Sequence, residues 1–130
     1  MAAHCEYPNG LAFAADERTL YVANTRWNAY IHAIELNAEG NMVRRRIFAD
    51  MASDVKEGVP DGMKVDAAGH LYCTGPRGIH VFDTGAKLLG VIRPPERPAN
   101  FVWGGDDHCT LFVTATTSLY CLRTRIPGRV

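Results

Sequence analysis

Short apolar runs alternate with polar turns along the whole chain. The runs are rich in β-branched and aromatic residues, and glycine, aspartate, asparagine and proline separate them. No segment keeps apolar residues at the 3.6-residue spacing of an amphipathic helix over three turns. We therefore predict an all-β protein. The expected strands cover residues 8–13, 19–23, 30–36, 42–48, 60–65, 71–74, 78–82, 87–92, 98–103, 110–115 and 118–122.

The expected strands fall into three similar units. Each unit opens with proline: Pro-Asn-Gly at residue 8, Pro-Asp-Gly at residue 60 and Pro-Ala-Asn at residue 98. The spacing of these openings brackets the usual period of a four-stranded propeller blade. We therefore predict one domain over residues 1–130, a partial β-propeller of four-stranded antiparallel blades at about 8–50, 60–95 and 98–123. A β-sandwich is the alternative, but it would not require the same opening in each unit.

Three units cannot close a ring. The third unit also has no apolar run that could form a fourth strand after residue 122. Propellers protect their sheet edges by closing radially, so an isolated half-ring would leave edges unsealed. We expect either a fragment of a longer protein or a chain that pairs with a second copy as a homodimer, and we favour the fragment.

Composition and charge narrow the classes of partner. Fourteen basic residues balance fourteen acidic ones, which gives no electrostatic reason to expect nucleic acid or an anionic membrane. No apolar run approaches the roughly 20 residues that span a bilayer, and the first residues do not resemble a secretion signal. Cys73 and Cys121 lie in apolar runs, where we expect reduced, packed thiols. These features favour a cytoplasmic protein without disulfides.

The unit openings carry the candidate chemistry. Asn9 and Asp61 are equivalent positions of neighbouring units, and propeller topology places both at one mouth of the central channel. An amide oxygen and a carboxylate that converge there suit a hard cation such as Ca²⁺ or Mg²⁺. The competing explanation is a local turn in which each side chain bonds its own backbone. Asn100 opens the third unit and is a candidate for contact with a substrate.

The connections between second and third strands return to the same mouth. In the first unit this connection contains Asn24 and Arg26, which we list as candidate contacts for a sugar-like substrate. The alternative is that both side chains belong to an ordinary solvated surface.

Three stretches resemble hallmark segments of the SMP-30/gluconolactonase/LRE-like family: residues 8–22, 58–72 and 101–114. The resemblance extends over about residues 7–123. It implies that this chain is half of a six-bladed propeller. It further implies that the whole propeller binds one divalent metal ion (Ca, Zn, Mg or Mn) in its channel and hydrolyses lactones of sugar acids. It also implies that Asn9 is a metal ligand, and that Asp61 is both a ligand and the catalytic general base. The family's remaining glutamate ligand has no counterpart here, and Glu6 lies outside any matching motif.

These features lead to a primary hypothesis and two alternatives. The primary hypothesis is metal-dependent hydrolysis of a small sugar lactone, in a form of the enzyme that is incomplete in this chain. One alternative is hydrolysis of other esters or of phosphotriesters by the same metal site. The other is a catalytically incompetent propeller fragment that binds a ligand or another chain.

Overall fold

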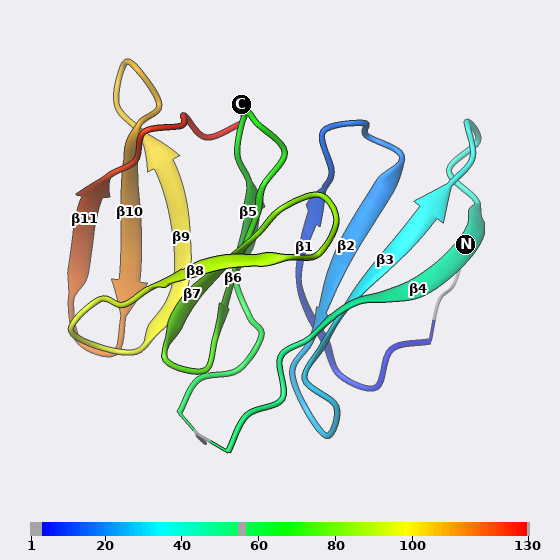
Figure 1. Ribbon diagram of the computed structural model, residues 1–130, viewed down its shortest axis with the longest axis horizontal. Coiled ribbons are helices and arrows are strands. Elements are labelled where there is room, and N and C mark those ends of the chain that lie inside the picture. The colour runs from blue at the N-terminus through cyan, green and yellow to red at the C-terminus, as the bar shows by residue number, and fades with distance from the viewer. Residues whose placement is uncertain (1–3, 55–56, 130) are drawn as a thin grey trace.

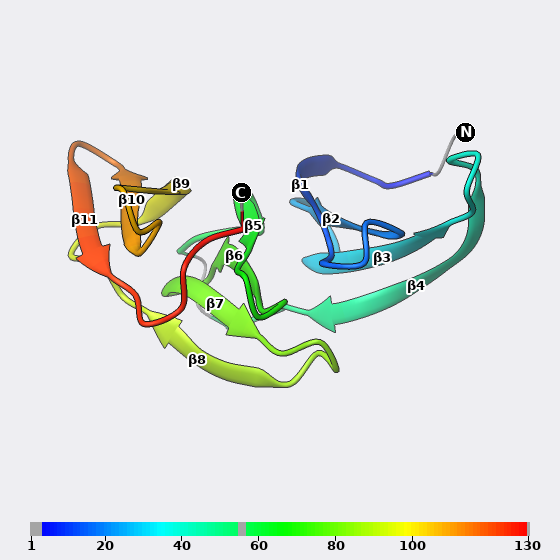
Figure 2. The same cartoon turned by 90° about the horizontal axis from the view of Figure 1, so that it is seen from above.

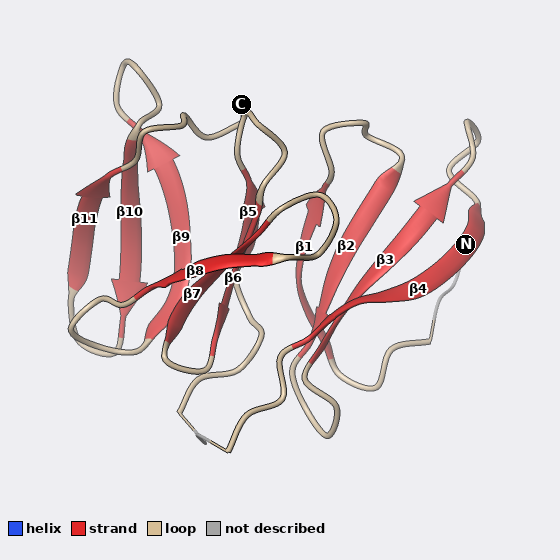
Figure 3. Cartoon of the chain, in the orientation of Figure 1, coloured by secondary structure: helices blue, strands red, loops and turns tan. Residues whose placement is uncertain are grey.

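The computed structural model describes residues 4–54 and 57–129, and it consists of strands and loops (Figure 3). Eleven strands form three antiparallel sheets, so the prediction of a partial β-propeller is confirmed. Within the described part of the chain, no helix is long and apolar enough to cross a membrane. The strands are β1 (Pro8–Phe13), β2 (Thr19–Asn24), β3 (Tyr30–Leu36), β4 (Met42–Asp50), β5 (Met63–Val65), β6 (Leu71–Gly75), β7 (Gly78–Phe82), β8 (Leu88–Ile92), β9 (Pro98–Gly104), β10 (Thr110–Ala115) and β11 (Leu119–Arg123).

Each sheet follows the order of the chain. The first unit is β1-β2-β3-β4, the second is β5-β6-β7-β8, and the third is β9-β10-β11. Viewed from above, the three sheets fan out with β1, β5 and β9 along the inner side and with β4 and β8 on the outer side (Figure 2). The first strand of each unit therefore faces the centre of the arc, as the first strand of a propeller blade does.

Asparagine and aspartate side chains close the hairpin turns. Asp16 is the simplest case: its Oδ1 accepts hydrogen bonds from the backbone N–H groups of Arg18 and Thr19 at 2.8 and 2.9 Å. The bond from Arg18 is the main reason that the pKa of the Asp16 carboxyl lies below its usual value. Such turns let a short polar side chain replace the backbone partner that a reversing chain lacks. The same pattern recurs at Asn37, Asp66 and Asp83.

The core lies between the sheets, and the second unit is covered on both faces. Leu71 and Cys73 of β6 pack toward the first unit, whereas Tyr72 between them packs toward the third. Because successive side chains of a strand point to opposite faces, all five residues of β6 are buried. In β11 burial alternates instead, since only one face of the third sheet has a neighbour.

The two cysteines that were expected to pack behave differently. Cys73 has no exposed surface, as predicted. Cys121 is exposed, so the prediction for this thiol was wrong. It lies on β11, on the face of the third sheet that no other unit covers. An apolar run alone does not reveal which of its two faces is covered.

The C-terminal tail joins all three units at the mouth opposite the unit openings. The carbonyl oxygen of Pro127 accepts a hydrogen bond from the Ala67 N–H at 2.9 Å, and Gly128 forms a bridge with Asp66. Arg129 then reaches the first unit, where it donates to the Ala14 carbonyl at 2.6 Å. Gly128 lies against the ring of Trp103 so closely that a Cβ would overlap it. This strap lies beyond residue 123, the end of the last expected unit, and was not predicted from the sequence.

Replacing Arg129 with alanine should lower the free energy of unfolding. The change removes the hydrogen bond to the Ala14 carbonyl and an ion pair with Glu17 at 2.9 Å. The Glu17 side chain is largely exposed, so the ion pair contributes little. We expect a loss of about 1 kcal/mol, measured by urea denaturation. Arg125→Ala is the matched control, because Arg125 is exposed and its side chain makes no hydrogen bond or ion pair with another described residue. Equal stability of the two variants would mean that the tail does not hold the units together.

Candidate metal site at the channel mouth

The openings of the three units lie side by side at one mouth of the arc, the lower end in Figure 1. A Cβ on Gly10 would overlap the backbone carbonyl of Asp61, and a Cβ on Gly62 would lie 2.6 Å from Oδ1 of Asn100. A hydrogen bond from the Gly62 N–H to the Ala99 carbonyl, at 3.2 Å, ties the second opening to the third. Only glycine permits such a close approach of two backbones. The glycine that follows each candidate ligand therefore brings neighbouring openings together.

Asp61 carries a half-buried carboxylate just before β5. Among the described residues it has no side-chain hydrogen bond and no salt bridge. The buried thiol of Cys73 lies close to the backbone of Asp61 and donates a hydrogen bond to the Thr74 carbonyl at 3.3 Å. Burial raises the pKa of that thiol to about 12, and the neighbouring Asp61 N–H opposes the shift. Cys73 is therefore uncharged, and the Asp61 carboxylate is available to a ligand.

Asn9 lies in β1, one residue before Gly10, and its side chain is exposed. Within the described ranges its amide makes no hydrogen bond, so the local turn expected as the competing explanation is not formed by this side chain. Asn9 and Asp61 together offer an amide oxygen and a carboxylate on adjacent unit openings. This donor set fits a hard divalent cation. In residues 4–54 and 57–129, no group of three or more His, Cys, Asp and Glu residues is arranged to hold a metal ion.

Asn100 occupies the same place in the third unit but uses its amide locally. Its Oδ1 accepts the backbone N–H of Phe101 at 2.9 Å, and its carbonyl accepts the hydroxyl of Thr114 at 3.1 Å. The residue is exposed, and its amide nitrogen makes no hydrogen bond with another described residue. The predicted substrate contact of Asn100 stays a prediction, for which the amide N–H groups are available.

Asn24 organises the rim loop that follows β2. Its side chain is buried and donates to the carbonyls of Arg26 and Asn28 at 3.0 and 2.6 Å. Its Oδ1 accepts the Tyr7 N–H at 2.7 Å. These bonds use the amide within the loop, so the structure gives Asn24 a positioning role, and its predicted contact with substrate remains a prediction. The sequence could not reveal this, because loop asparagines bind either backbone or ligand.

Arg26 is exposed on that loop and lies over the ring of Tyr7, with Cζ 4.6 Å from the ring centroid. Trp27 packs edge-on against the same ring, at 6.0 Å between centroids. The loop is joined to the second unit by the hydroxyl of Thr25, which donates to the Pro60 carbonyl at 2.7 Å. The side chain of Arg26 is thus available at the same mouth as Asp61, although the structure records no contact between them.

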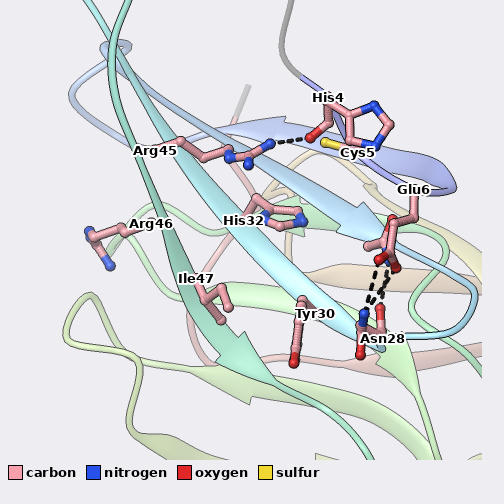
Figure 4. A pocket seen from close by; sticks show the side chains of 10 residues that line it. His4, Cys5, Glu6, Asn28, Tyr30, His32, Arg45, Arg46 and Ile47 are labelled. Carbon is pink, nitrogen blue, oxygen red and sulfur yellow. Dashed lines mark hydrogen bonds between the residues drawn. The ribbon is translucent and has the colours of Figure 1, made fainter.

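A hollow away from the candidate metal ligands lies beside the outer strand β4, and Asn24 is part of its lining (Figure 4). It contains neither Asn9 nor Asp61. Glu6 faces it and accepts hydrogen bonds from the amide of Asn28 at 3.1 Å, so this carboxylate serves the rim loop. His32 also lines it. Burial lowers the pKa of the His32 imidazole, and the charge of Arg45 lowers it further. Both effects favour the neutral form of His32, which is not one of the candidate metal ligands.

A protein-family model described as "SMP-30/Gluconolactonase/LRE-like region" matches residues 1–117. The chain belongs to this family. A gluconolactonase from Zymomonas mobilis is 32% identical over 127 residues, and regucalcin from Danio rerio is 31% identical over 112 residues. The solved structure of a gluconolactonase from Xanthomonas campestris superposes with a TM-score of 0.79 at 35% identity.

Membership in the SMP-30/gluconolactonase family accounts for the fold and for a lactone-hydrolase relationship. The alignments cover 93%, 82% and 98% of this chain respectively, but only 36%, 37% and 39% of the three relatives. This chain therefore spans well under half the length of the family members it matches. The activity of a whole family member is for that reason a proposal here.

Replacing Gly10 with alanine should destabilise the protein and disturb the neighbouring opening. The new methyl group would overlap the Asp61 carbonyl, so the backbone of one unit must move. We expect the free energy of unfolding to fall by about 1–3 kcal/mol, measured by urea denaturation. Gly90→Ala is the control, since nothing lies within 4 Å of the added atom. If Gly10→Ala were as stable as Gly90→Ala, the two openings would not be in close contact.

Proposed function

We propose that this chain is part of a divalent-metal-dependent hydrolase of sugar-acid lactones, to which it contributes Asn9 and Asp61. The observation that carries the proposal is the pair of unpaired oxygen-bearing side chains on adjacent openings, held together by the Gly10 contact. The relationship to gluconolactonases supports a small lactone as substrate. We include in the proposal the cytoplasmic location expected from the sequence.

Asn9 and Asp61 would hold one divalent metal ion, for which the candidates are Ca²⁺, Mg²⁺, Mn²⁺ and Zn²⁺. When bound, such an ion supplies Lewis-acid polarisation of the lactone carbonyl and stabilises the charge that develops on its oxygen. Two protein ligands are few for a hard cation, which usually takes six or more oxygens. We therefore propose that the remaining protein ligand comes from outside this chain.

Asp61 would act as the general base. Its carboxylate takes a proton from the water that attacks the lactone carbonyl, and a C–O bond forms. The ring C–O bond then breaks, and the ring oxygen receives a proton and becomes a hydroxyl group. The product is an open-chain hydroxy acid. The half-buried position of Asp61, between the close backbone contacts at Gly10 and Gly62, would keep the carboxylate oriented during this transfer.

Completion of the ring would complete the site. The chain covers 36–39% of the three relatives named above, so we propose that further units of a longer polypeptide supply the rest of the six-bladed ring. A second copy of this chain is the alternative source, and the mass of the native protein in solution distinguishes the two.

Replacing Asp61 with asparagine in the native polypeptide should remove lactone hydrolysis. The amide cannot accept the proton, and we expect kcat to fall by about 10²- to 10⁴-fold. Asn9→Ala should instead weaken metal binding, with the dissociation constant rising at least about tenfold. Hydrolysis of D-glucono-1,5-lactone and calorimetric titration with Mn²⁺ measure the two effects.

Asp106→Asn is the matched control for charge, because Asp106 is exposed in the β9–β10 turn at the opposite mouth. It should leave both hydrolysis and metal binding unchanged. Full activity of Asp61→Asn would refute the proposed role of Asp61, and unchanged metal affinity of Asn9→Ala would refute that of Asn9.

A further inference from the structure

Asp61 shares a hollow with a basic residue that the sequence analysis did not single out. The hollow has a volume of about 200 Å³ and lies between the segments that lead into the second and third units. Arg97 and Asp61 both line it. The remaining lining residues are Gly58, Val59, Pro98 and Ala99, none of which is charged. In the part of the chain that the structure describes, Asp61 and Arg97 are therefore the two ionisable groups that a ligand in this hollow would meet.

The backbone that carries Arg97 is held rigidly. Pro94, Pro95 and Pro98 surround it, and each proline ring fixes its own φ angle and restricts the residue before it. Glu96 anchors the segment to the β10–β11 loop, because its carboxylate accepts hydrogen bonds from both the hydroxyl and the backbone N–H of Thr117. The hydroxyl bond is the main reason that the pKa of Glu96 is lowered. Arg97 is thus presented from a fixed position.

The guanidinium of Arg97 is exposed, and in the described part of the chain it has no hydrogen bond or salt bridge. An adjoining hollow of about 130 Å³ is lined by both Arg97 and Arg77. The acidic side chains there are Glu57, which forms no described salt bridge, and Glu96, which is tied to Thr117. An unpaired guanidinium that extends from a restrained backbone beside a proposed catalytic base is arranged to bind part of a substrate.

We propose that Arg97 is a specificity-determining residue that binds a second, negatively charged group of the lactone, a carboxylate or a phosphate. The planar fork of donors on arginine matches the oxygens of both groups. The substrate class would then be lactones of sugar acids that carry an acidic substituent remote from the ring carbonyl. This inference rests on the proposed function, because it assigns Asp61 to the chemistry and Arg97 to recognition.

The test compares anionic and neutral lactones in the native polypeptide. D-glucaro-1,4-lactone carries a free carboxylate, 6-phosphoglucono-1,5-lactone carries a phosphate, and D-glucono-1,5-lactone carries neither. Arg97→Gln should lower kcat/KM for an anionic lactone by about 10- to 100-fold, while kcat/KM for the neutral lactone changes by less than about twofold. The anionic lactone with the larger loss identifies the group that Arg97 binds.

Two variants make the result specific. Arg97→Lys keeps the charge without the fork, so it should restore part of the lost preference. Arg93→Gln removes an exposed arginine that lines neither hollow and should leave the preference unchanged. The inference would be overturned if Arg97→Gln lowered kcat/KM equally for anionic and neutral lactones. It would also be overturned if Arg93→Gln lowered the preference for anionic lactones as much as Arg97→Gln.

Failure of the proposed function gives a different result. If the native polypeptide accelerated the hydrolysis of none of the three lactones above the rate without protein, the proposed hydrolase activity would be wrong. The five-membered D-glucaro-1,4-lactone opens slowly by itself in water, so it could then serve as a ligand in a calorimeter. Titration with D-glucaro-1,4-lactone would then test Arg97 directly. Binding that Arg97→Gln weakens about tenfold or more supports recognition of an anion, and binding that is equal in both proteins, or absent, refutes it.

Discussion

The close approach of neighbouring backbones at Gly10 and Gly62 is the contact on which the rest of the channel mouth depends. A side chain at either position would overlap the next unit, so the inner strands could not lie as near to one another. That contact sets the separation of the unit openings. It therefore also sets where Asn9, Asp61 and Asn100 stand relative to one another.

The arc is held from both ends of its inner strands. At the mouth, backbone contacts and the bond from Thr25 to Pro60 join the openings. At the opposite end, the C-terminal strap joins the third unit to the other two. Between these ends, the second sheet is covered on both faces. The first and third sheets each keep one apolar face exposed, marked by Leu11 and Phe13 of β1 and by Val102 and Leu119 of the third unit. Further blades of a ring would pack on such faces.

The sequence predicted the features that recur. Three proline-led openings, alternating strands and aspartate turns are local patterns, and repetition made each of them easier to read. The third sheet has three strands, as expected from the lack of an apolar run after residue 122. Asn9 and Asp61 were proposed for the same reason, since equivalent positions of neighbouring blades lie at one mouth.

The features that the sequence did not predict depend on contacts that occur once. The strap at Pro127–Arg129 pairs with residues about 60 positions away, and nothing in its composition indicates a partner. Cys121 looked like a core residue because a strand pattern does not say which face is covered. Asn24 and Arg97 were hard to assign for a similar reason. Whether a polar side chain in a loop bonds the backbone or faces a hollow is decided by the segments that lie beside it.

The most direct test of the account is a crystal structure of the native polypeptide grown with Mn²⁺ and measured near the manganese absorption edge. The account predicts one anomalous peak at about 2.0–2.6 Å from both the amide oxygen of Asn9 and a carboxylate oxygen of Asp61, the range for oxygen ligands of divalent cations. An ion bound elsewhere, or two oxygens too far apart to touch the same ion, would contradict it.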